Sequence, residues 1–401
     1  MSIFAARLCP RQRPPLPAHG EAKSLRRKGQ RPKRRRAQPT DNKINIISKK
    51  NNHNIMKNKI VLTGGCGFIG SHTCVELQQA GYDVVIFDNL SNSEASVVDG
   101  IERITGTRPA FYQIDCTDKA AVYQAFQKEG PIAGVIHFAA SKAVGESVEK
   151  PLLYYRNNLT SLMNMLEAAD DFHLKGFVFS SSCTVYGEPD AGRNPVDETA
   201  PIKPALSPYG NTKQIAEEII RDVEHAGVGF KTIVLRYFNP VGAHPSAEIG
   251  ELPRGVPQNL LPYVCQTAMG IRKELSVFGD DYATPDGSCI RDYIDVIDLA
   301  RAHVCALNRM VEGKSEEKVE YFNLGTGRGV SVLELINTFR EATGVDVPYQ
   351  VVGRREGDIE QIWGCVTKAN TVLGWKAEVP LRETLANAWR WQQKLRERGV
   401  M

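Results

Sequence analysis

Short apolar runs alternate with longer amphipathic stretches along most of the chain, from residue 59 to about residue 325. Runs rich in Val, Ile and Phe predict buried strands, and the stretches between them predict helices. Because strand and helix alternate at this spacing, we expect an α/β fold of Rossmann type, with a doubly wound parallel sheet. The predicted strands are 59–63, 82–87, 110–114, 134–140, 176–180, 232–237 and 319–324, and the predicted helices are 71–80, 118–128, 150–169, 209–224 and 296–310.

The strict alternation ends after Asn239, where a Pro-rich connection covers residues 240–262. Two further helices are predicted at 332–342 and 381–394. A body of about 340 residues exceeds what one hydrophobic core usually serves, so two lobes are expected. We expect a Rossmann domain at 57–240, to which a later segment of the chain near 295–325 returns. We also expect a smaller C-terminal α/β substrate lobe at 241–401.

The first predicted strand runs into a glycine-rich turn, GGCGFIG at 64–70, and the second strand ends at Asp88. Glycines permit a tight turn and a close approach of the backbone to a pyrophosphate, while the next helix points free N–H groups at the phosphates. The Asp88 carboxylate suits a ribose diol and repels a 2′-phosphate, which favours NAD over NADP. A glycine turn that binds nothing is the alternative. The flanking strand and helix and the spacing of Asp88 argue against it.

Ligands of such sheets lie at the carboxyl ends of the strands. Two of these ends carry reactive groups. The triple serine Ser180–Ser182 closes the fifth strand, and Tyr209 and Lys213 open the following helix at positions i and i+4, which share one face. A nearby ammonium and a positively charged nicotinamide would lower the pKa of the Tyr209 phenol, so that Tyr209 could abstract a hydroxyl proton while Ser182 holds the same oxygen. The alternatives are a surface Tyr–Lys pair and a serine helix cap.

The charge is divided unevenly along the chain. The total is +4, from 50 Lys and Arg against 46 Asp and Glu. Residues 1–58 carry 16 Lys and Arg against two acids, a net charge of +14, and the remainder carries 34 against 44, a net charge of −10. The basic character that would suggest nucleic-acid binding therefore belongs to the tail, and no nucleic-acid partner is expected for the body.

The tail, 1–56, is rich in Arg, Lys, Pro and Asn and has little apolar periodicity, so we expect a disordered basic extension. A nuclear address or nucleic-acid arm at Arg34–Arg36, an organelle transit peptide, and a non-native extension read from an upstream start codon are the competing interpretations. Met56, just before the first strand, favours the last. A secretory signal is not expected, because the tail lacks an apolar central segment.

No run of apolar residues approaches the ~20 needed to span a membrane, so no membrane association is expected. The nine cysteines are an odd number without any CxxC pair, which favours free thiols in a reducing compartment such as the cytoplasm. No metal site is predicted.

Dense motifs make the body resemble the extended short-chain dehydrogenase/reductase family and, within it, the UDP-glucose 4-epimerases. The resemblance covers residues 57 to about 397. It rests on TGGCGFIGSHT at 63–73, DNLSNS at 88–93, KAVGESVEKPLLYYRNN at 142–158, SSSCTVYGEP at 180–189, SPYGNTK at 207–213, RYFNPVGAHPS at 236–246, NLLPYV at 259–264, VFGDDYATPDGSCIRDYI at 277–294 and RREGD at 354–358.

The resemblance implies two sets of binding residues. The NAD set is Gly64, Gly67, Phe68, Ile69, Gly70, Asp88, Asn89, Asn92, Ser93, Asp115, Cys116, Phe138, Lys142, Asn157, Tyr209, Lys213 and Phe238. The UDP-sugar set is Ser182, Asn239, Asn259, Leu260, Ser276, Val277, Phe278, Arg291, Arg355 and Asp358. Two arginines suit a diphosphate, although either could instead form an ordinary salt bridge.

The resemblance also implies the reaction, in which UDP-glucose and UDP-galactose are interconverted. Tyr209 takes the 4-OH proton with Ser182 and Lys213 beside it, hydride leaves C4, and the 4-keto sugar turns its other face and is reduced again. A homodimer is implied as well. Ala140 and Ser141 replace the usual Gly-Leu before Lys142. Ile362 stands where side-chain size influences access of N-acetylated sugars.

Several alternatives remain beside this interpretation. A UDP-glucuronate or UDP-N-acetylhexosamine 4-epimerase stays open. Nucleotide-sugar dehydratases and decarboxylases are disfavoured, because Cys183 and Thr184 stand where those enzymes carry carboxylates. A non-enzymatic NAD-sensing regulator with a basic arm would not need the Ser182, Tyr209 and Lys213 set.

Overall fold

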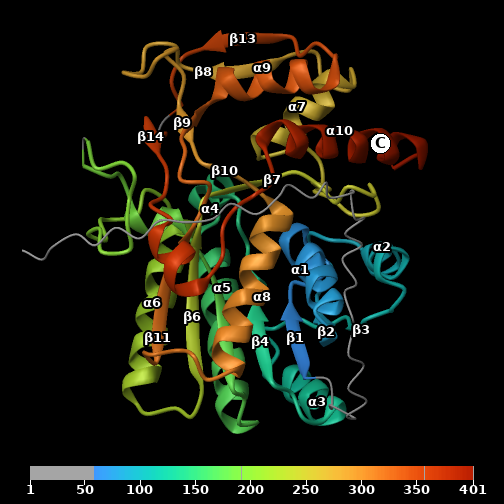
Figure 1. Ribbon diagram of the computed structural model, residues 1–401, viewed down its shortest axis with the longest axis vertical. Coiled ribbons are helices and arrows are strands. Elements are labelled where there is room, and N and C mark those ends of the chain that lie inside the picture. Colours follow the sequence, from blue (N-terminus) through green and yellow to red (C-terminus); the bar gives the residue numbers. More distant parts are fainter. Residues whose placement is uncertain (1–57, 191, 356, 401) are drawn as a thin grey trace, which may run out of the picture. The chain divides into compact units, whose positions relative to one another are not determined.

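Seven parallel strands form the central sheet of the computed structural model, which describes residues 58–190, 192–355 and 357–400 (Figure 1). The expected basic extension at 1–56 lies outside the described residues. The strand order is β11-β6-β5-β4-β1-β2-β3, which is the order of dinucleotide-binding sheets with one strand added. The strands are β1 (Lys59–Thr63), β2 (Asp83–Phe87), β3 (Ala110–Tyr112), β4 (Gly134–His137), β5 (Gly176–Ser182), β6 (Lys231–Tyr237) and β11 (Val319–Leu324).

Helices cover both faces of the sheet because its strands are apolar on both sides. In β1, Ile60 and Leu62 enter one core, whereas Val61 enters the core on the opposite face. Side chains that alternate along a strand thus bury themselves in both directions. The first core is closed by α1 (Phe68–Gln79), α2 (Ser96–Thr105) and α8 (Val296–Val311), and the second by α3 (Lys119–Glu129), α5 (Pro151–Asp171) and α6 (Pro208–His225) (Figure 1).

The expected parallel sheet, with its strands and long helices, is confirmed, and only some boundaries differ. The strands predicted at 110–114 and 134–140 end earlier, at Tyr112 and His137, whereas the fifth strand continues to Ser182. The sequence analysis missed α2. Its interior Gly100 weakens the local helix signal, yet a Cβ there would lie 2.7 Å from the Glu248 carbonyl oxygen. The glycine therefore serves a tertiary contact.

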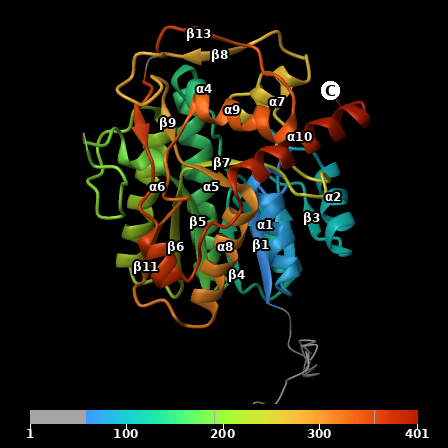
Figure 2. The ribbon, with the colours of Figure 1, turned by 45° about the horizontal axis from the view of Figure 1, so that its top comes forward.

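The C-terminal segments gather at the end of the sheet toward which its strands run, as Figures 1 and 2 show together. They have a core of their own, in which Leu261, Phe339 and Leu385 are buried. The return strand β11 joins the large sheet within the expected segment near 295–325. The elements outside the large sheet and its flanking helices are α4 (Val144–Glu149), β7 (Asn239–Val241), α7 (Leu260–Ala268), β8 (Leu275–Phe278), β9 (Ile290–Arg291), β10 (Tyr293–Asp295), β12 (Val330–Ser331), α9 (Val332–Thr343), β13 (Tyr349–Val352), β14 (Gln361–Ile362) and α10 (Leu381–Glu397).

No helix in the described ranges is long and apolar enough to cross a membrane. The eight cysteines of the same ranges are free thiols. Within them, no group of three His, Cys, Asp or Glu side chains could hold a metal ion.

A buried ion pair joins α6 to the sheet. Both nitrogens on one edge of the Arg236 guanidinium contact Glu217, with Nη2–Oε2 at 2.6 Å and Nε–Oε1 at 3.0 Å. The side chains are only 5% and 4% exposed. Ser181 donates a further hydrogen bond to Glu217, and Arg236 donates one to the Tyr186 hydroxyl. Such a pair tolerates burial because hydrogen bonds satisfy both charges.

Replacing Glu217 with Ala should therefore destabilise the protein strongly. The substitution leaves the Arg236 guanidinium buried without its charge partner, and breaking a buried pair in this way costs about 3–5 kcal/mol of unfolding free energy. Urea denaturation measures the change. Asp99→Ala, which removes a surface ion pair with Arg108, is the matched control and should leave the unfolding midpoint nearly unchanged. Equal effects of the two substitutions would contradict this account of the ion pair.

Candidate active site

The glycine turn after β1 has the shape that a phosphate-binding loop needs. Gly64 adopts φ +68°, and a Cβ on Gly70 would lie 2.3 Å from the Gly64 carbonyl oxygen. Gly67 is the N-cap of α1, where no side chain caps the helix and the first turn has no acidic residue. The N–H groups at the start of α1 are thus left to a ligand, and the partial positive charge of the helix end favours an anion.

Asp88 connects this turn with the loop after β2. Its Oδ2 accepts a hydrogen bond from the Cys66 backbone N–H at 3.0 Å. Its Oδ1 accepts from the Leu90 N–H at 2.9 Å and from the Ser93 hydroxyl at 2.7 Å. The carboxylate is 7% exposed. It is therefore held rigidly at the end of β2, beside the turn, as the interpretation of Asp88 as a ribose-binding residue requires. Asn92 is exposed on the same loop.

The end of β3 carries a second ordered carboxylate. Asn89 donates to Asp115 at 2.9 Å, and the Thr117 N–H and hydroxyl donate to the same side chain at 2.8 and 2.7 Å. Burial alone would raise the pKa of Asp115, but these hydrogen bonds lower it below its usual value. Cys116 is buried, and burial raises the pKa of its thiol to about 12. Cys116 thus contributes a neutral surface beside Asp115.

Beyond β4, side-chain amides fix the segment in which Ala140 and Ser141 depart from the family pattern. Asn158 accepts from the Ser141 N–H at 2.8 Å and donates to the Ser141 carbonyl oxygen at 3.0 Å. Asn157 donates to the Ser141 hydroxyl at 3.2 Å. The departure is therefore accommodated by hydrogen bonds, and Asn157 lies against this segment. Phe138, also on this side of the site, packs on the His303 ring with centroids 4.7 Å apart.

The three candidate catalytic side chains meet at the end of β5. Ser207 caps α6 by accepting from the Gly210 N–H at 3.1 Å, and Pro208 occupies the first turn. Tyr209 then lies beside Ser182, close enough for the serine hydroxyl to favour the phenolate. The Lys213 ammonium donates to the Ser180 carbonyl oxygen at 2.6 Å and lies 5.9 Å from the centre of the Tyr209 ring. The predicted constellation of Ser182, Tyr209 and Lys213 is therefore assembled.

Burial acts on both titratable groups of this set. It raises the pKa of Tyr209 to about 12, and the hydrogen bond with Ser182 opposes the shift. Burial also lowers the pKa of Lys213 to about 8, against the charge of Glu217, which raises it. The expected lowering of the Tyr209 pKa is thus not produced by Lys213 alone. Without a further positive charge the phenol stays protonated at neutral pH, because a low-dielectric site disfavours phenolate.

A second cluster of polar side chains lies in the C-terminal segments. Asp358 accepts from Arg355 at 2.6 Å and pairs with Arg291 at 3.8 Å. The arginines thus form the salt bridges considered as the alternative, and a single carboxylate brings them together. The Arg355 guanidinium also lies 5.4 Å from the Phe278 ring centre. Two adjacent guanidinium groups beside an exposed aromatic ring suit a diphosphate joined to a base.

The remaining predicted substrate residues differ in what they can offer a ligand. Val277 is 1% exposed in the C-terminal core, so only its backbone is available. Asn259 is the N-cap of α7, next to Leu260. Asn239 joins β7 to β10 by donating its backbone N–H to the Asp292 carbonyl oxygen at 2.9 Å. Ser276 lies in β8 and is partly buried.

Phe238 and Ile362 share a small apolar cluster beneath the site. Phe238 is 3% exposed, and Ile362 is equally buried in β14. The cluster also contains Val185, from the 3₁₀ turn after Ser182. Ile362 thus borders the segment that carries the candidate catalytic residue Ser182.

Two polar groups near the site were not among the predicted site residues. The Thr184 hydroxyl oxygen is buried and has no hydrogen-bond partner in the part of the chain that the structure describes. A buried hydroxyl without a hydrogen-bond partner costs free energy of folding. The Thr184 hydroxyl is therefore available to hydrogen-bond a ligand. Glu217 lies one helical turn beyond Lys213. Its i+4 spacing could have marked it, but its partner Arg236 is on another element.

Comparison with known proteins agrees with this geometry. The NAD dependent epimerase/dehydratase family matches residues 60–325. UDP-glucose 4-epimerase of Bacillus subtilis is 49% identical over 333 residues, which are 83% of this chain and 96% of that protein. The mouse (Mus musculus) UDP-glucose 4-epimerase is 46% identical over 342 residues, which are 84% and 97% of the two chains.

Solved structures give the same result. UDP-glucose 4-epimerase from Stenotrophomonas maltophila, with bound NAD and formylated UDP-arabinopyranose, has a TM-score of 0.81 and 48% identity over 85% of this chain and 99% of that one. The Bifidobacterium longum enzyme, in complex with NAD+ and UDP, has a TM-score of 0.80 and 44% identity over 84% and 98%. The chain therefore belongs to the NAD dependent epimerase/dehydratase family, in the group of the UDP-glucose 4-epimerases.

Proposed function

We propose that the protein is an isomerase that interconverts UDP-glucose and UDP-galactose by oxidation and re-reduction at C4 of the sugar. The observation that carries the proposal is that Ser182, Tyr209 and the Lys213 ammonium lie together at the end of β5 in a dinucleotide-type sheet. The relatives that match 83–85% of this chain over 96–99% of their own length are UDP-glucose 4-epimerases.

The turn around Gly64–Gly70 fits NAD. It offers uncapped N–H groups at the start of α1 to a pyrophosphate and the fixed carboxylate of Asp88 to a ribose diol. NAD, when bound, supplies an acceptor for hydride from C4 and returns the hydride to the same carbon. The adenosine side would be held by Asn89, Asn92, Ser93, Asp115 and Cys116, and the nicotinamide side by Phe138, Lys142, Asn157, Tyr209, Lys213 and Phe238.

Tyr209 is the base and acid of the reaction. In its partly buried position the phenol resists ionisation, so it would require a positive nicotinamide ring together with Lys213 to become phenolate. It then takes the proton of the sugar 4-OH, and Ser182 donates a hydrogen bond to the developing oxyanion. When the 4-keto sugar presents its opposite face, Tyr209 returns the proton to the same oxygen.

We assign the two ligands to different parts of the chain. Residues 57–240, with the return segment near 295–325, bind NAD, and residues 241–401 bind the UDP moiety. Arg291 and Arg355, aligned by Asp358, take the diphosphate. Asn239, Asn259, Leu260, Ser276, Val277 and Phe278 complete this substrate site.

Water elimination at this site is disfavoured by the residues after Ser182. Dehydratases of this fold need a carboxylic acid there, whereas Cys183 and Thr184 occupy the positions. Burial raises the pKa of the Cys183 thiol to about 12, so the thiol stays neutral and is a poor acid or base at neutral pH.

We also propose that two copies associate through exposed apolar side chains of α4 and α5. This α4–α5 face consists of Val144, Val148, Leu152, Leu153 and Met163, whose exposed fractions range from 44% to 70%. A patch of large apolar side chains in water favours association, and homodimers are symmetric about one shared face.

We propose a cytoplasmic location, with which the free thiols of the described residues agree.

Purified protein should carry NAD and convert either UDP-hexose into the other without added cofactor. Tyr209→Phe should lower turnover by about 10²–10⁴-fold, because the proton transfer is lost, while NAD remains bound. Chromatographic separation of UDP-glucose and UDP-galactose measures the turnover, and absorbance of the released nucleotide measures the NAD content. Full activity of the variant would sink the assignment of Tyr209.

Lys213→Met should shift the pH dependence of turnover toward higher pH. Removing the ammonium raises the pKa of Tyr209, so the phenolate forms only at higher pH and the rising limb of kcat/KM moves in the same direction. The profile is measured from pH 6 to 10 with saturating NAD. Lys203→Met, which removes a surface ion pair with Asp190, is the control. An unshifted limb in Lys213→Met would exclude an electrostatic role of Lys213.

Leu152→Glu should dissociate the homodimer. Leu152 is 70% exposed in the α4–α5 face, and a charge there would be buried without a partner in the assembly. Light scattering after size exclusion reports the molar mass. Ile271→Glu introduces the same charge at an apolar position that is 49% exposed after α7, and it should leave the mass unchanged. A dimer that survives Leu152→Glu would place the interface elsewhere.

A further inference from the structure

Arg254 binds the loop that carries the proposed ribose-binding residues. This β2–α2 loop covers residues 88–95, between the end of β2 and the start of α2. Arg254 Nη1 donates to the Ser91 carbonyl oxygen at 3.2 Å, and Nη2 donates to the Ser93 carbonyl oxygen at 2.5 Å. Arg254 and Ser93 are 161 positions apart in the sequence. The contact therefore joins the part of the chain assigned to the UDP moiety to the part assigned to NAD.

The two hydrogen bonds depend on the shape of the guanidinium group. Its N–H donors point in fixed directions within one plane. The two carbonyl groups, which lie on either side of Asn92 in the sequence, must therefore keep one separation while Arg254 is bound. Arg254 forms no salt bridge within the described ranges. Its guanidinium is thus held by the backbone of the loop and not by a carboxylate.

The β2–α2 loop needs such support because its backbone is strained. Leu90 has φ 59°, a left-handed conformation that residues other than glycine seldom adopt and that persists only where neighbouring groups hold it. Ser91 and Asn92 are exposed. Inside the loop, the Leu90 N–H and the Ser93 hydroxyl both donate to Asp88 Oδ1, at 2.9 and 2.7 Å. A displacement of Ser93 would therefore also release the Asp88 carboxylate.

The segment that carries the arginine is itself anchored. This β7–α7 segment covers residues 242–259. The indole N–H of Trp391 donates to the Glu251 carbonyl oxygen at 2.9 Å, and a Cβ on Gly250 would lie 2.5 Å from the indole ring. The Glu251 carboxylate lies 3.4 Å from the Lys142 ammonium. The backbone of the segment is thus fixed against α10 and oriented without a ligand.

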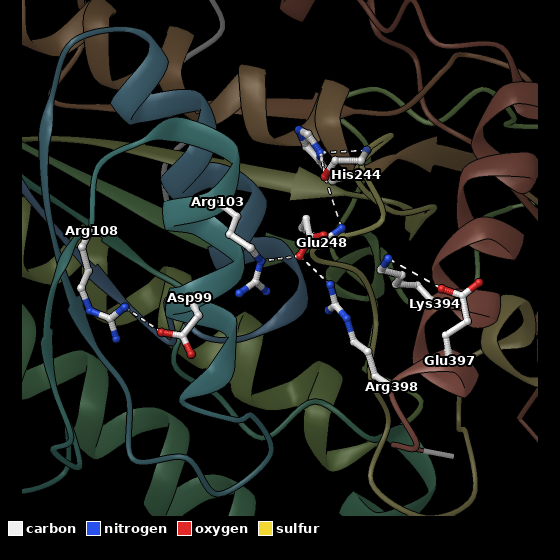
Figure 3. A network of polar contacts seen from close by, with 9 residues as sticks. Asp99, Arg103, Arg108, His244, Glu248, Lys394, Glu397 and Arg398 are labelled. Carbon is white, nitrogen blue, oxygen red and sulfur yellow. Dashed lines mark hydrogen bonds and ion pairs between the residues drawn. The ribbon is translucent and has the colours of Figure 1, made fainter.

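The same segment is attached to α2, the helix that follows the loop. Glu248 Oε2 accepts from Arg103 of α2 at 2.6 Å and from Arg398, which follows α10, at 2.5 Å (Figure 3). Glu248 therefore binds the helix, and Arg254 binds the loop before it. Through these two contacts the β7–α7 segment holds the loop and the helix in one fixed relation.

We propose that Arg254 is a positioning residue that retains NAD. By holding the carbonyl oxygens of Ser91 and Ser93, it keeps Ser93 on Asp88 and thereby keeps the proposed ribose-binding carboxylate in place. Release of the adenosine half of NAD then requires that the two arginine hydrogen bonds break first, because loops that enclose a ligand must open before it leaves. The inference rests on the proposed function, since that function places the adenosine ribose at Asp88.

The test measures how fast the purified full-length holoenzyme exchanges its NAD for radiolabelled NAD in excess. Arg254→Met removes both hydrogen bonds, so exchange should become about tenfold faster. Arg254→Lys can donate to one of the two carbonyl groups and should exchange only about threefold faster than the wild type. With saturating NAD, the kcat for UDP-galactose should stay within about twofold in both variants, because retention and not proton transfer is affected.

A double variant tests whether Arg254 acts through Ser93. Ser93→Ala removes the hydroxyl that donates to Asp88, and in this background Arg254→Met should accelerate exchange by less than about twofold, since effects of residues that act in series are not additive. A full tenfold acceleration in this background would overturn the proposed route through Ser93.

Arg390→Met is the matched control. Arg390 donates to the Pro245 carbonyl oxygen of the same β7–α7 segment at 3.1 Å, so its loss loosens the segment without removing a contact to the β2–α2 loop. Its exchange rate should equal that of the wild type. An unchanged rate in Arg254→Met, or an equal acceleration in Arg390→Met, would overturn the proposal.

The outcomes also separate this inference from the proposed function, because label exchange requires no sugar. If the wild type inverts C4 and Arg254→Met exchanges NAD at the wild-type rate, the positioning role fails alone. If the wild type exchanges NAD but inverts neither UDP-hexose, the proposed function fails, and the comparison of exchange rates still decides the role of Arg254. A wild type that binds no NAD overturns both.

Discussion

The buried ion pair between Glu217 and Arg236 is the contact on which the catalytic end of the sheet depends. Arg236 belongs to β6 and Glu217 to α6, the helix that also carries Tyr209 and Lys213. Ser181 of β5 joins the pair by a hydrogen bond of 2.6 Å. The helix is therefore fixed to two strands at once, in rotation as well as in distance. Because Ser182 follows Ser181 directly, the same network sets the distance between the serine and the phenol.

This arrangement places charge where water is excluded, and it determines how the site can react. Lys213 is almost fully buried, and its ammonium is held by the Ser180 carbonyl oxygen and by the field of Glu217. Burial raises the pKa of Tyr209, so the phenol by itself is unreactive at neutral pH. In the proposed reaction the phenol would become a base only when a further positive charge enters, which a bound oxidised nicotinamide would provide. The proposal therefore couples the reactivity of the Tyr209 phenol to the presence of bound NAD.

Two carboxylates organise the opposite side of the site in a similar manner. Asp358 draws together Arg291 and Arg355, and Glu251 draws together Lys142 and Asn259. Each acid lies between groups that are far apart in the sequence and thereby fixes their positions, and the two arginines beside Asp358 suit a diphosphate. The partners of both acids are thus oriented by the folded chain before any ligand contributes, which reduces the entropy that binding must overcome.

The sequence by itself determined the parallel sheet, the segments that form its strands and the side chains at its reactive end. Apolar runs bounded by Gly64, Asp88 and Ser182 carry this information locally, because strand burial and turn formation depend on neighbouring residues. Only the tertiary structure decided α2, the buried partner of Glu217, the raised pKa of Tyr209 and the contacts of Glu251. Gly100 in α2 is explained by the distant Glu248 carbonyl, and Glu251 reaches Lys142 across 109 positions of sequence. Contacts over such separations leave no periodic signal, since they arise only when the folded chain excludes water and brings the groups together.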